Sequence, residues 1–125
     1  ISWFQKRKKI VAVEPENCPT LNVALKKGKP SNVSVSGVAA SALGAKSIGN
    51  ICFNLSKENQ IESLLVSDDE IETARRLLWE NHRIFVEPAG AAALAAIISG
   101  KYKPKTDEKL AVLICGANPN IIPEF

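Results

Sequence analysis

The most regular pattern of apolar and polar positions spans residues 67–83. Ser67, followed three residues later by Glu70, matches a capping box, in which two backbone N–H groups at a helix start are satisfied reciprocally. Acidic side chains fill the first turn, and His82 and Arg83 lie in the last, as the helix dipole favours. We therefore predict a surface helix that covers a sheet, with an apolar face formed by Ile71, Ala74, Leu77 and Leu78.

A second pattern, VEPAGAAALAAIISG at residues 86–100, is small or apolar on every side. Pro88 suits the first turn of a helix, and Gly100 suits the position just after a helix end. The stretch therefore predicts a buried helix. Glu87 stands at its head, where a carboxylate also favours the helix dipole, so this residue has a structural and a functional interpretation.

Short apolar runs separate the helical patterns and predict buried strands at residues 9–13, 61–66, 84–86 and 110–115. Further helices are expected at residues 19–27 and 47–56, and residues 1–8 are typical of a helix end. Residues 33–49 fit either a functional loop or a helix-loop-helix connection. Strands that alternate with helices predict an α/β fold with a mostly parallel sheet.

Composition and charge refine this picture mainly by exclusion. The chain of 125 residues, 46% apolar and 23% charged, is typical of one globular domain at most. Its net charge of +3 comes from lysines without interleaved aromatic residues, which argues against a nucleic-acid partner. No apolar run reaches the roughly 18 residues that a membrane span needs, so no membrane partner is expected.

The cysteine and methionine content indicates the redox compartment of the protein and whether the sequence is a complete protein. Cys18, Cys52 and Cys115 are odd in number and lack the spacing of metal ligands, as expected for thiols in a reducing, cytoplasmic compartment. No secretion signal is visible. The sequence contains no methionine and opens on ISWF, which is typical of the end of an amphipathic helix. We therefore expect a piece of a longer protein.

Three of the apolar runs end in a polar or reactive side chain: Glu14, Glu87 and Cys115. In open α/β sheets, ligands bind outside the carboxyl ends of the strands, so this convergence is the main pointer to a site. Each residue also has an ordinary structural interpretation. Glu14 fits a solvated loop residue, Glu87 a helix-start charge and Cys115 a packed core thiol.

Other catalytic signatures are missing. Gly37, Gly44 and Gly49 do not form the dinucleotide fingerprint, and the chain has no phosphate-binding Walker loop, HExxH motif or nucleophile elbow. His82, the only histidine, lies at a predicted helix end, so we interpret it as a capping or surface residue.

Five segments carry a family resemblance: VAVEPENCPTL, VSGVAASALGAKSIGN, VSDDEI, VEPAGAAALAA and VLICGAN. In order and spacing they resemble the C-terminal part of the pyridoxal-phosphate-dependent serine/threonine dehydratases, whose fold is that of the tryptophan synthase β-subunit. Serine racemase is similar to the same group. The resemblance implies a three-layer α/β fold, with residues 1–125 as the C-terminal portion of the catalytic domain.

The resemblance also implies roles for individual residues at a pyridoxal 5′-phosphate site. Cys115 matches the residue that faces the pyridine nitrogen, and Gly116, Ala117 and Asn118 complete the turn beside the ring. Glu87 would lie close to the cofactor, and Gly37 matches a loop glycine of the site. A thiol holds the ring nitrogen protonated less well than an aspartate does, which favours rapid expulsion of a β-hydroxyl.

A cation site is implied by the same resemblance. Glu14 would supply a carboxylate oxygen, while Cys18, Leu43 and Ala45 would supply backbone carbonyl oxygens. Thr20 stands where racemase-like members carry another carboxylate. Fewer anionic ligands suit a monovalent cation such as potassium better than a divalent one.

The expected reaction of the whole enzyme is dehydration and deamination of L-serine or L-threonine, small amino-acid substrates, to a 2-oxo acid and ammonia. The family's lysine that binds the cofactor and its glycine-rich phosphate loop would lie before residue 1, so the fragment alone is expected to be inactive. A homodimer is usual for this fold. The alternatives are a serine racemase or hydroxyaspartate dehydratase of the same fold, and a non-catalytic α/β binding module.

Overall fold

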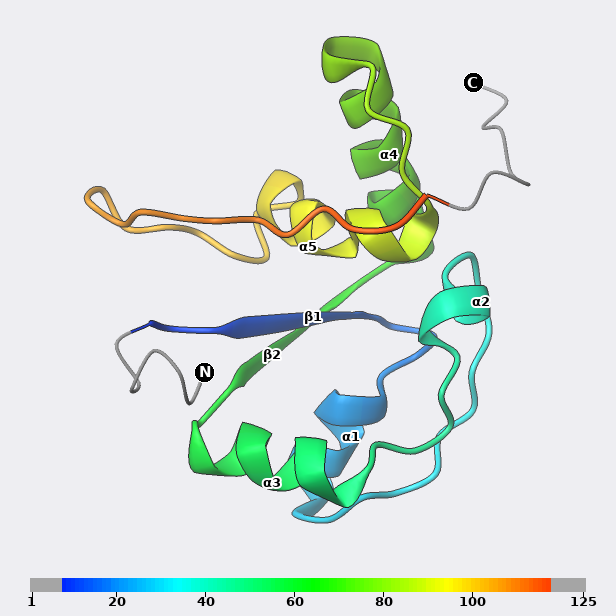
Figure 1. Cartoon of the computed structure of the whole chain (residues 1–125), viewed down its shortest axis with the longest axis vertical. Helices are drawn as coiled ribbons and strands as arrows, with labels where there is room; N and C mark the ends of the chain where they lie inside the picture. The colour runs from blue at the N-terminus through cyan, green and yellow to red at the C-terminus, as the bar shows by residue number, and fades with distance from the viewer. Residues whose placement is uncertain (1–7, 118–125) are drawn as a thin grey trace.

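A computed structural model describes residues 8–117 of the chain. The predicted helix end at residues 1–8, except for Lys8, therefore lies outside the described part, as does the predicted site residue Asn118. Figure 1 shows the arrangement of the elements. In chain order they are β1 (Val11–Pro15), α1 (Thr20–Lys27), α2 (Ala40–Leu43), α3 (Asn50–Glu58), β2 (Glu62–Val66), α4 (Asp68–His82) and α5 (Pro88–Ile98).

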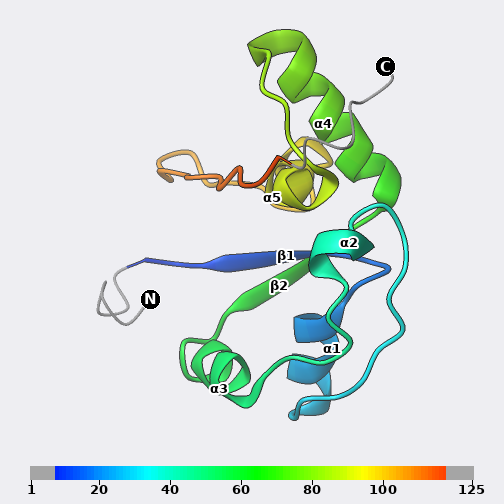
Figure 2. The same ribbon diagram turned by 45° about the vertical axis from the view of Figure 1, so that its right-hand side comes forward.

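The two strands pair in parallel, with Val11 opposite Glu62 and Pro15 opposite Val66. Helices α1 and α3 lie on one face of the pair, and α5 and α4 lie on the other (Figures 1 and 2). This is the predicted three-layer α/β fold. The core lies between the strands, α4 and α5, and includes Val66, Ile71 and Leu78.

Helix α4 forms as its sequence predicts. Ser67 Oγ accepts from the backbone N–H of Glu70 at 3.2 Å, and Glu70 Oε2 accepts from the backbone N–H of Ser67 at 2.7 Å. The predicted capping box is thus confirmed. The helix ends where Arg83 adopts a left-handed conformation with φ of 54°. Its buried face packs mainly against α5, and α5 in turn contacts both strands. The prediction that this helix covers the sheet is therefore wrong, because α5 lies between α4 and the strands.

Helix α5 confirms the predicted buried helix, with Pro88 in its first turn and four fully or almost fully buried alanines along its length. Small side chains let its backbone approach its neighbours closely. Among residues 8–117, no helix has the length and apolar content needed to cross a bilayer.

Two predicted strands are wrong. Residues 84–86 and 110–115 are not strands, because within the described part of the chain neither has a regularly hydrogen-bonded neighbour. The second run was expected to be buried on both faces, yet its residues alternate in exposure: Ile114 is half-buried, whereas Leu113 is 74% exposed. One side of this extended segment packs against α5, and the other is open.

Smaller differences concern element boundaries. Strand β1 begins two residues later than predicted and includes Glu14, which therefore lies inside the strand. Helix α3 is shifted toward the C-terminus, at Asn50–Glu58. Residues 33–49 form a long loop with only the short helix α2.

Candidate functional site

The head of α5 meets the end of the extended segment that leads to Cys115 and Gly116. The backbone N–H of Glu87 donates to the carbonyl oxygen of Gly116 at 3.2 Å. A Cβ on Gly90 would overlap the carbonyl oxygen of Cys115, and a Cβ on Gly116 would overlap the Glu87 carboxylate. Gly116 also has φ of +81°, which favours glycine. The structure thus brings together Glu87, Cys115 and Gly116, three of the predicted site residues.

Side-chain exposure at this junction separates the alternatives left open by the sequence. Cys115 is exposed, so its interpretation as a packed core thiol is wrong for this chain. Glu87 is the N-cap residue of α5, yet its side chain makes no capping hydrogen bond with the helix. The junction therefore presents a thiol and a half-buried carboxylate beside a glycine turn.

Glu14 performs a different task. Its two carboxylate oxygens accept from the backbone N–H groups of Leu21 and Asn22, in the first turn of α1, at 2.7 and 2.8 Å. The interpretation as a solvated loop residue is therefore wrong. The expectation of three strand ends at one sheet edge is also wrong for the described residues, because Glu14 lies inside β1 and the segments before Glu87 and Cys115 join neither strand.

Three of the predicted cation ligands, Glu14, Cys18 and Ala45, lie around the start of α1. The carbonyl oxygen of Ala45 accepts from Thr20 Oγ1 at 2.7 Å, and the carbonyl oxygen of Cys18 accepts from the backbone N–H of Thr20 at 3.0 Å. Leu43 ends α2, two residues before Ala45. Within residues 8–117, no three His, Cys, Asp or Glu side chains converge as a metal-ligand set. A cation at this place would therefore depend on carbonyl oxygens together with Glu14.

The side chain of Cys18 has a role that the sequence did not indicate. It is 1% exposed, and its thiol donates to the carbonyl oxygen of Ser36 at 3.3 Å. Cys18 was expected to contribute only its backbone carbonyl, so that side-chain identity would matter little. The thiol instead helps to hold the loop that carries Gly37.

Gly37 lies in that loop with φ of +85°, and a Cβ there would overlap the carboxylate of Asp68, the first residue of α4. Asp68 Oδ2 accepts from Asn17 Nδ2 at 3.1 Å and lies 3.4 Å from the backbone N–H of Val38. Sequence reasoning missed Asn17 and treated Asp68 only as a first-turn charge, because both contacts join residues that are far apart along the chain.

Lys101, just after α5, pairs with Glu70 at 2.8 Å and with Glu16 at 3.2 Å. The hydrogen bond to Glu70 raises the pKa of Lys101, although burial acts in the opposite direction. Burial acts to raise the pKa of Glu70, but the hydrogen bonds from Lys101 and Ser67 outweigh it, so the pKa of Glu70 is lowered. Lys101 is therefore a charged structural residue and is poorly suited to act as a nucleophilic amine.

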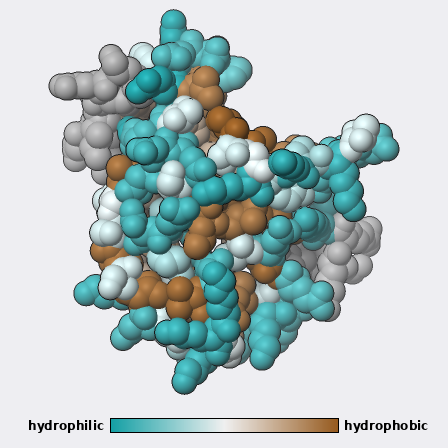
Figure 3. Space-filling model, turned by 180° about the vertical axis from the view of Figure 1, so that it is seen from behind, coloured by the Kyte–Doolittle hydropathy of each residue, from teal (hydrophilic) through white to brown (hydrophobic). Residues whose placement is uncertain are grey.

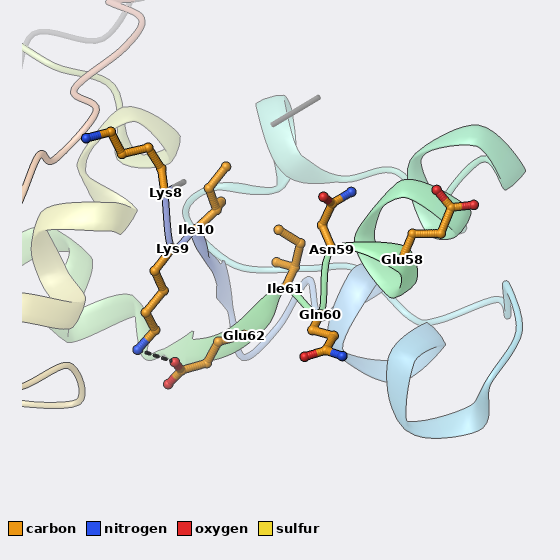
Figure 4. A pocket seen from close by; sticks show the side chains of 8 residues that line it. All are labelled: Lys8, Lys9, Ile10, Glu58, Asn59, Gln60, Ile61 and Glu62. Atoms are coloured by element: carbon orange, nitrogen blue, oxygen red, sulfur yellow. Dashed lines mark ion pairs between the residues drawn. The ribbon is translucent and has the colours of Figure 1, made fainter. Parts of the chain in front are cut away.

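A cavity of about 430 Å³ lies away from these residues, where the two strands begin (Figure 4). Lys9 and Glu62 form an ion pair of 2.8 Å across one side of it. Parallel sheets bind ligands at the opposite, carboxyl edge. Because this hollow lies at the amino edge of the strands and its Lys9 and Glu62 pair with each other, we place the candidate site at the head of α5 instead.

Comparisons with known proteins show the family of the chain. A family model described as "Pyridoxal-phosphate dependent enzyme" matches residues 3–116. The chain is 33% identical to the biosynthetic L-threonine dehydratase of Haemophilus influenzae over 123 residues, 96% of this chain and 24% of that protein. It is 39% identical to the serine racemase of Dictyostelium discoideum over 75 residues, 59% of this chain and 23% of that protein.

A solved structure is similar over most of the chain. The crystal structure of a threonine deaminase from T.th. matches with a TM-score of 0.80 and 30% identity, over 92% of this chain and 41% of that one. The chain spans about a quarter of the length of the curated relatives named above.

Proposed function

Because this chain belongs to the family of pyridoxal-phosphate-dependent enzymes, we propose that it is the C-terminal portion of an ammonia-lyase that acts on L-serine or L-threonine. The whole enzyme removes the β-hydroxyl as water, and hydrolysis of the remaining enamine gives a 2-oxo acid and ammonia. Relatives named as threonine dehydratases support this reaction, since they are about a third identical over 90% or more of this chain.

The residues at the head of α5 fit the cofactor. The junction presents a thiol, a half-buried carboxylate and the Gly116 turn, and a turn without a side chain lets a planar ring approach the backbone closely. Cys115, Gly116, Glu87 and Gly37 would hold the group, together with Asn118. When bound, pyridoxal phosphate supplies an electron sink for bond cleavage at the amino-acid substrate.

In this proposal Cys115, Gly116 and Glu87 each have a defined role at the cofactor. The exposed Cys115 thiol would hydrogen-bond the ring nitrogen and, unlike an aspartate, would not hold it protonated. Gly116 would complete the turn beside the ring, and Glu87, whose backbone N–H donates to the carbonyl oxygen of Gly116, would lie close to the cofactor. The single observation that carries the proposal is this packing of the residues 87–90 turn against Cys115 and Gly116.

We also propose a monovalent cation, such as potassium, at the start of α1. Glu14 would supply a carboxylate oxygen, and Cys18, Leu43 and Ala45 carbonyl oxygens. Supporting this, the carbonyl of Ala45 is held at Thr20, beside the helix turn that Glu14 binds. A site of carbonyls with one carboxylate suits a weakly charged cation.

The lysine that binds the cofactor is proposed to come from the part of the protein before this chain. Lys9 and Lys101, next to the strands and α5, are engaged in ion pairs. Apolar surface remains open: Figure 3 shows hydrophobic patches on the face opposite to that of Figure 1. The exposed large apolar side chains include Ile51, Leu55, Leu110 and Leu113. Such patches are typical of surfaces that a further part of a protein covers.

The experiment uses the full-length protein with pyridoxal phosphate and either L-serine or L-threonine. We expect equal amounts of 2-oxo acid and ammonia. The serine racemase relative, at 39% identity, makes racemisation the second candidate. Recovery of the D-amino acid without 2-oxo acid would overturn the dehydratase proposal in favour of the racemase.

A further inference from the structure

Residues 36–38, which we call the strap, cross the carboxyl ends of both strands. On one side the strap binds the turn that follows β1: the backbone N–H of Ser36 donates to the carbonyl oxygen of Asn17 at 3.1 Å. On the other side it meets Asp68, which follows β2. Figure 2 shows the loop before α2 passing beside the start of α4. The strap therefore joins the two strand ends at the edge where parallel sheets bind ligands.

Asp68 is the centre of this arrangement. Its Oδ2 atom accepts from Asn17 Nδ2 at 3.1 Å and lies 3.4 Å from the backbone N–H of Val38. The side chain also fills the space beside Gly37, where any Cβ would overlap the carboxylate. One carboxylate thus holds a side chain from the β1 turn and the backbone of the strap. Hydrogen bonds to a charged group are among the stronger ones in proteins.

The position of Asp68 is itself fixed. Ser67 and Glu70 on either side of it form the capping box, so the first turn of α4 is held in one geometry. The carboxylate is also favoured by the positive end of the helix dipole. A rigid helix start therefore sets the place of the strap, in which Gly37 has a φ of +85° and lies against the Asp68 carboxylate.

We propose that Asp68 is a positioning residue of the cofactor and substrate site: it sets the strap, and the strap sets the affinity for pyridoxal phosphate. Asp68 acts through Gly37 and Val38. Short helix α2, which directly follows the strap, contacts α5, whose head carries Glu87. Displacement of the strap therefore reaches the junction that holds the cofactor. The inference rests on the proposed function in taking Gly37 and Glu87 as residues of a pyridoxal phosphate site.

Cys18 offers a readout that is independent of catalysis. Its thiol is buried under the strap and donates to Ser36. We would measure, in the full-length protein, the rate at which iodoacetamide labels Cys18, by mass spectrometry of its peptide. The variants are Asp68→Ala, Asp68→Asn and, as a control of equal charge change in the same helix turn, the exposed Asp69→Ala. The affinity for pyridoxal phosphate is measured by titration of the same variants.

We expect Asp68→Ala to raise the labelling rate of Cys18 and to weaken pyridoxal phosphate binding, each about tenfold, as loss of a charge-assisted hydrogen bond implies. Asp68→Asn keeps an oxygen acceptor for Asn17 and Val38, so both values should stay within about twofold of the parent. Asp69→Ala should change neither.

Equal labelling of Cys18 in the parent and in Asp68→Ala would overturn the role of Asp68 in setting the strap. Faster labelling with unchanged cofactor affinity would overturn its link to the site. If Asp69→Ala reproduced both changes, they would arise from general weakening of α4, and the proposal would fall. Labelling does not depend on the reaction, so a racemase would leave this test intact.

Discussion

The head of α5 and the head of α1 are built in opposite ways. At α5, Glu87 makes no capping hydrogen bond through its side chain and Cys115 is exposed. A Cβ on Gly90 would overlap the Cys115 carbonyl oxygen, and one on Gly116 would overlap the Glu87 carboxylate. At α1, by contrast, Glu14 uses both carboxylate oxygens to hold the first turn. The carboxylate at the head of α1 therefore stabilises its helix, whereas the one at the head of α5 does not cap its own.

This difference shows which of the two helix starts is held by hydrogen bonds within this chain and which leaves polar groups open to a ligand. At the α1 head the hydrogen-bond donors of Thr20 and Cys18 find partners within the chain, in Ala45 and Ser36, and only acceptor oxygens are left for the proposed cation. At the α5 head, the Glu87 carboxylate makes no capping hydrogen bond and the Cys115 thiol is exposed, so both groups are open to a ligand. Polar side chains without structural tasks, placed on a rigid backbone, are typical of ligand sites. Changes at α5 should therefore act through packing and function, whereas changes at α1 should act through hydrogen bonding.

The largest effect is expected from Gly90→Ala. The added Cβ would overlap the carbonyl oxygen of Cys115, which is backbone and cannot rotate away. Overpacking of this kind costs about 2–3 kcal/mol of stability. We expect a lower thermal midpoint of the full-length protein and a loss of pyridoxal phosphate affinity.

Gly49→Ala provides the control for Gly90→Ala. A Cβ at Gly49 meets nothing within 4 Å, and its φ of −71° is open to any residue. Its thermal midpoint should match the parent. A Gly90→Ala protein as stable as Gly49→Ala would refute the close packing of α5 against Cys115.

The second effect concerns the α1 head. Glu14→Ala leaves the N–H groups of Leu21 and Asn22 without their acceptors, at a cost of about 2 kcal/mol. Glu14→Gln keeps one acceptor oxygen and should lose about half as much. Urea unfolding of the full-length proteins checks both values, with the exposed Glu58→Ala as the control. Equal stability of Glu14→Ala and Glu58→Ala would remove the contrast between the two heads.

The elements that sequence alone predicted are those with a local cause. The capping box of α4 needs only Ser67 and Glu70, three residues apart, and the buried character of α5 follows from its own alanines. Both were predicted correctly. Strand status, however, depends on a neighbour: residues 110–115 carry an apolar pattern but have no paired strand among the described residues.

The same distinction between local and long-range causes applies to the residues of the candidate site. Glu87 and Cys115 could be named because each ends an apolar run, yet the contact between Gly90 and Cys115 joins residues 25 positions apart, and no spacing rule predicts it. The role of Asp68 at the strap could not be predicted from the sequence, because the helix dipole already explains an aspartate in the first turn of a helix. Only the fold shows that its carboxylate faces Gly37.

A smaller effect is expected from Lys101→Met, which removes the ion pairs with Glu70 and Glu16 that join the end of α5 to the start of α4 and to the turn after β1. Partly exposed pairs contribute about 0.5–1 kcal/mol. The exposed neighbour Lys103→Met is the control. High salt should narrow the difference in stability between the parent and Lys101→Met.

The pH dependence of that difference has a definite sign. The pKa of Glu70 is lowered from 4.5, so its contribution is full above pH 4.5 and is lost as pH falls through its folded pKa. The pKa of Lys101 is raised from 10.5, so its contribution is full below pH 10.5 and is lost as pH rises through its folded pKa. Thermal midpoints of the parent and Lys101→Met should therefore differ most between these limits. A difference that persists unchanged at strongly acidic pH would show that packing, not charge, is responsible.

The smallest effect on stability, within about 0.5 kcal/mol, is expected from Cys115→Ser and Cys115→Ala, because an exposed side chain loses little packing. The two variants should nevertheless differ in activity. A serine hydroxyl replaces the thiol as a hydrogen-bonding partner of a ring nitrogen, whereas alanine offers none. Parallel measurement of thermal midpoints and of 2-oxo acid formation separates packing from function at this position. If both variants match the parent in rate, Cys115 does not meet the ring. If instead both lose stability as Gly90→Ala does, the α5 head is a packing junction like any other, and its contrast with the α1 head disappears.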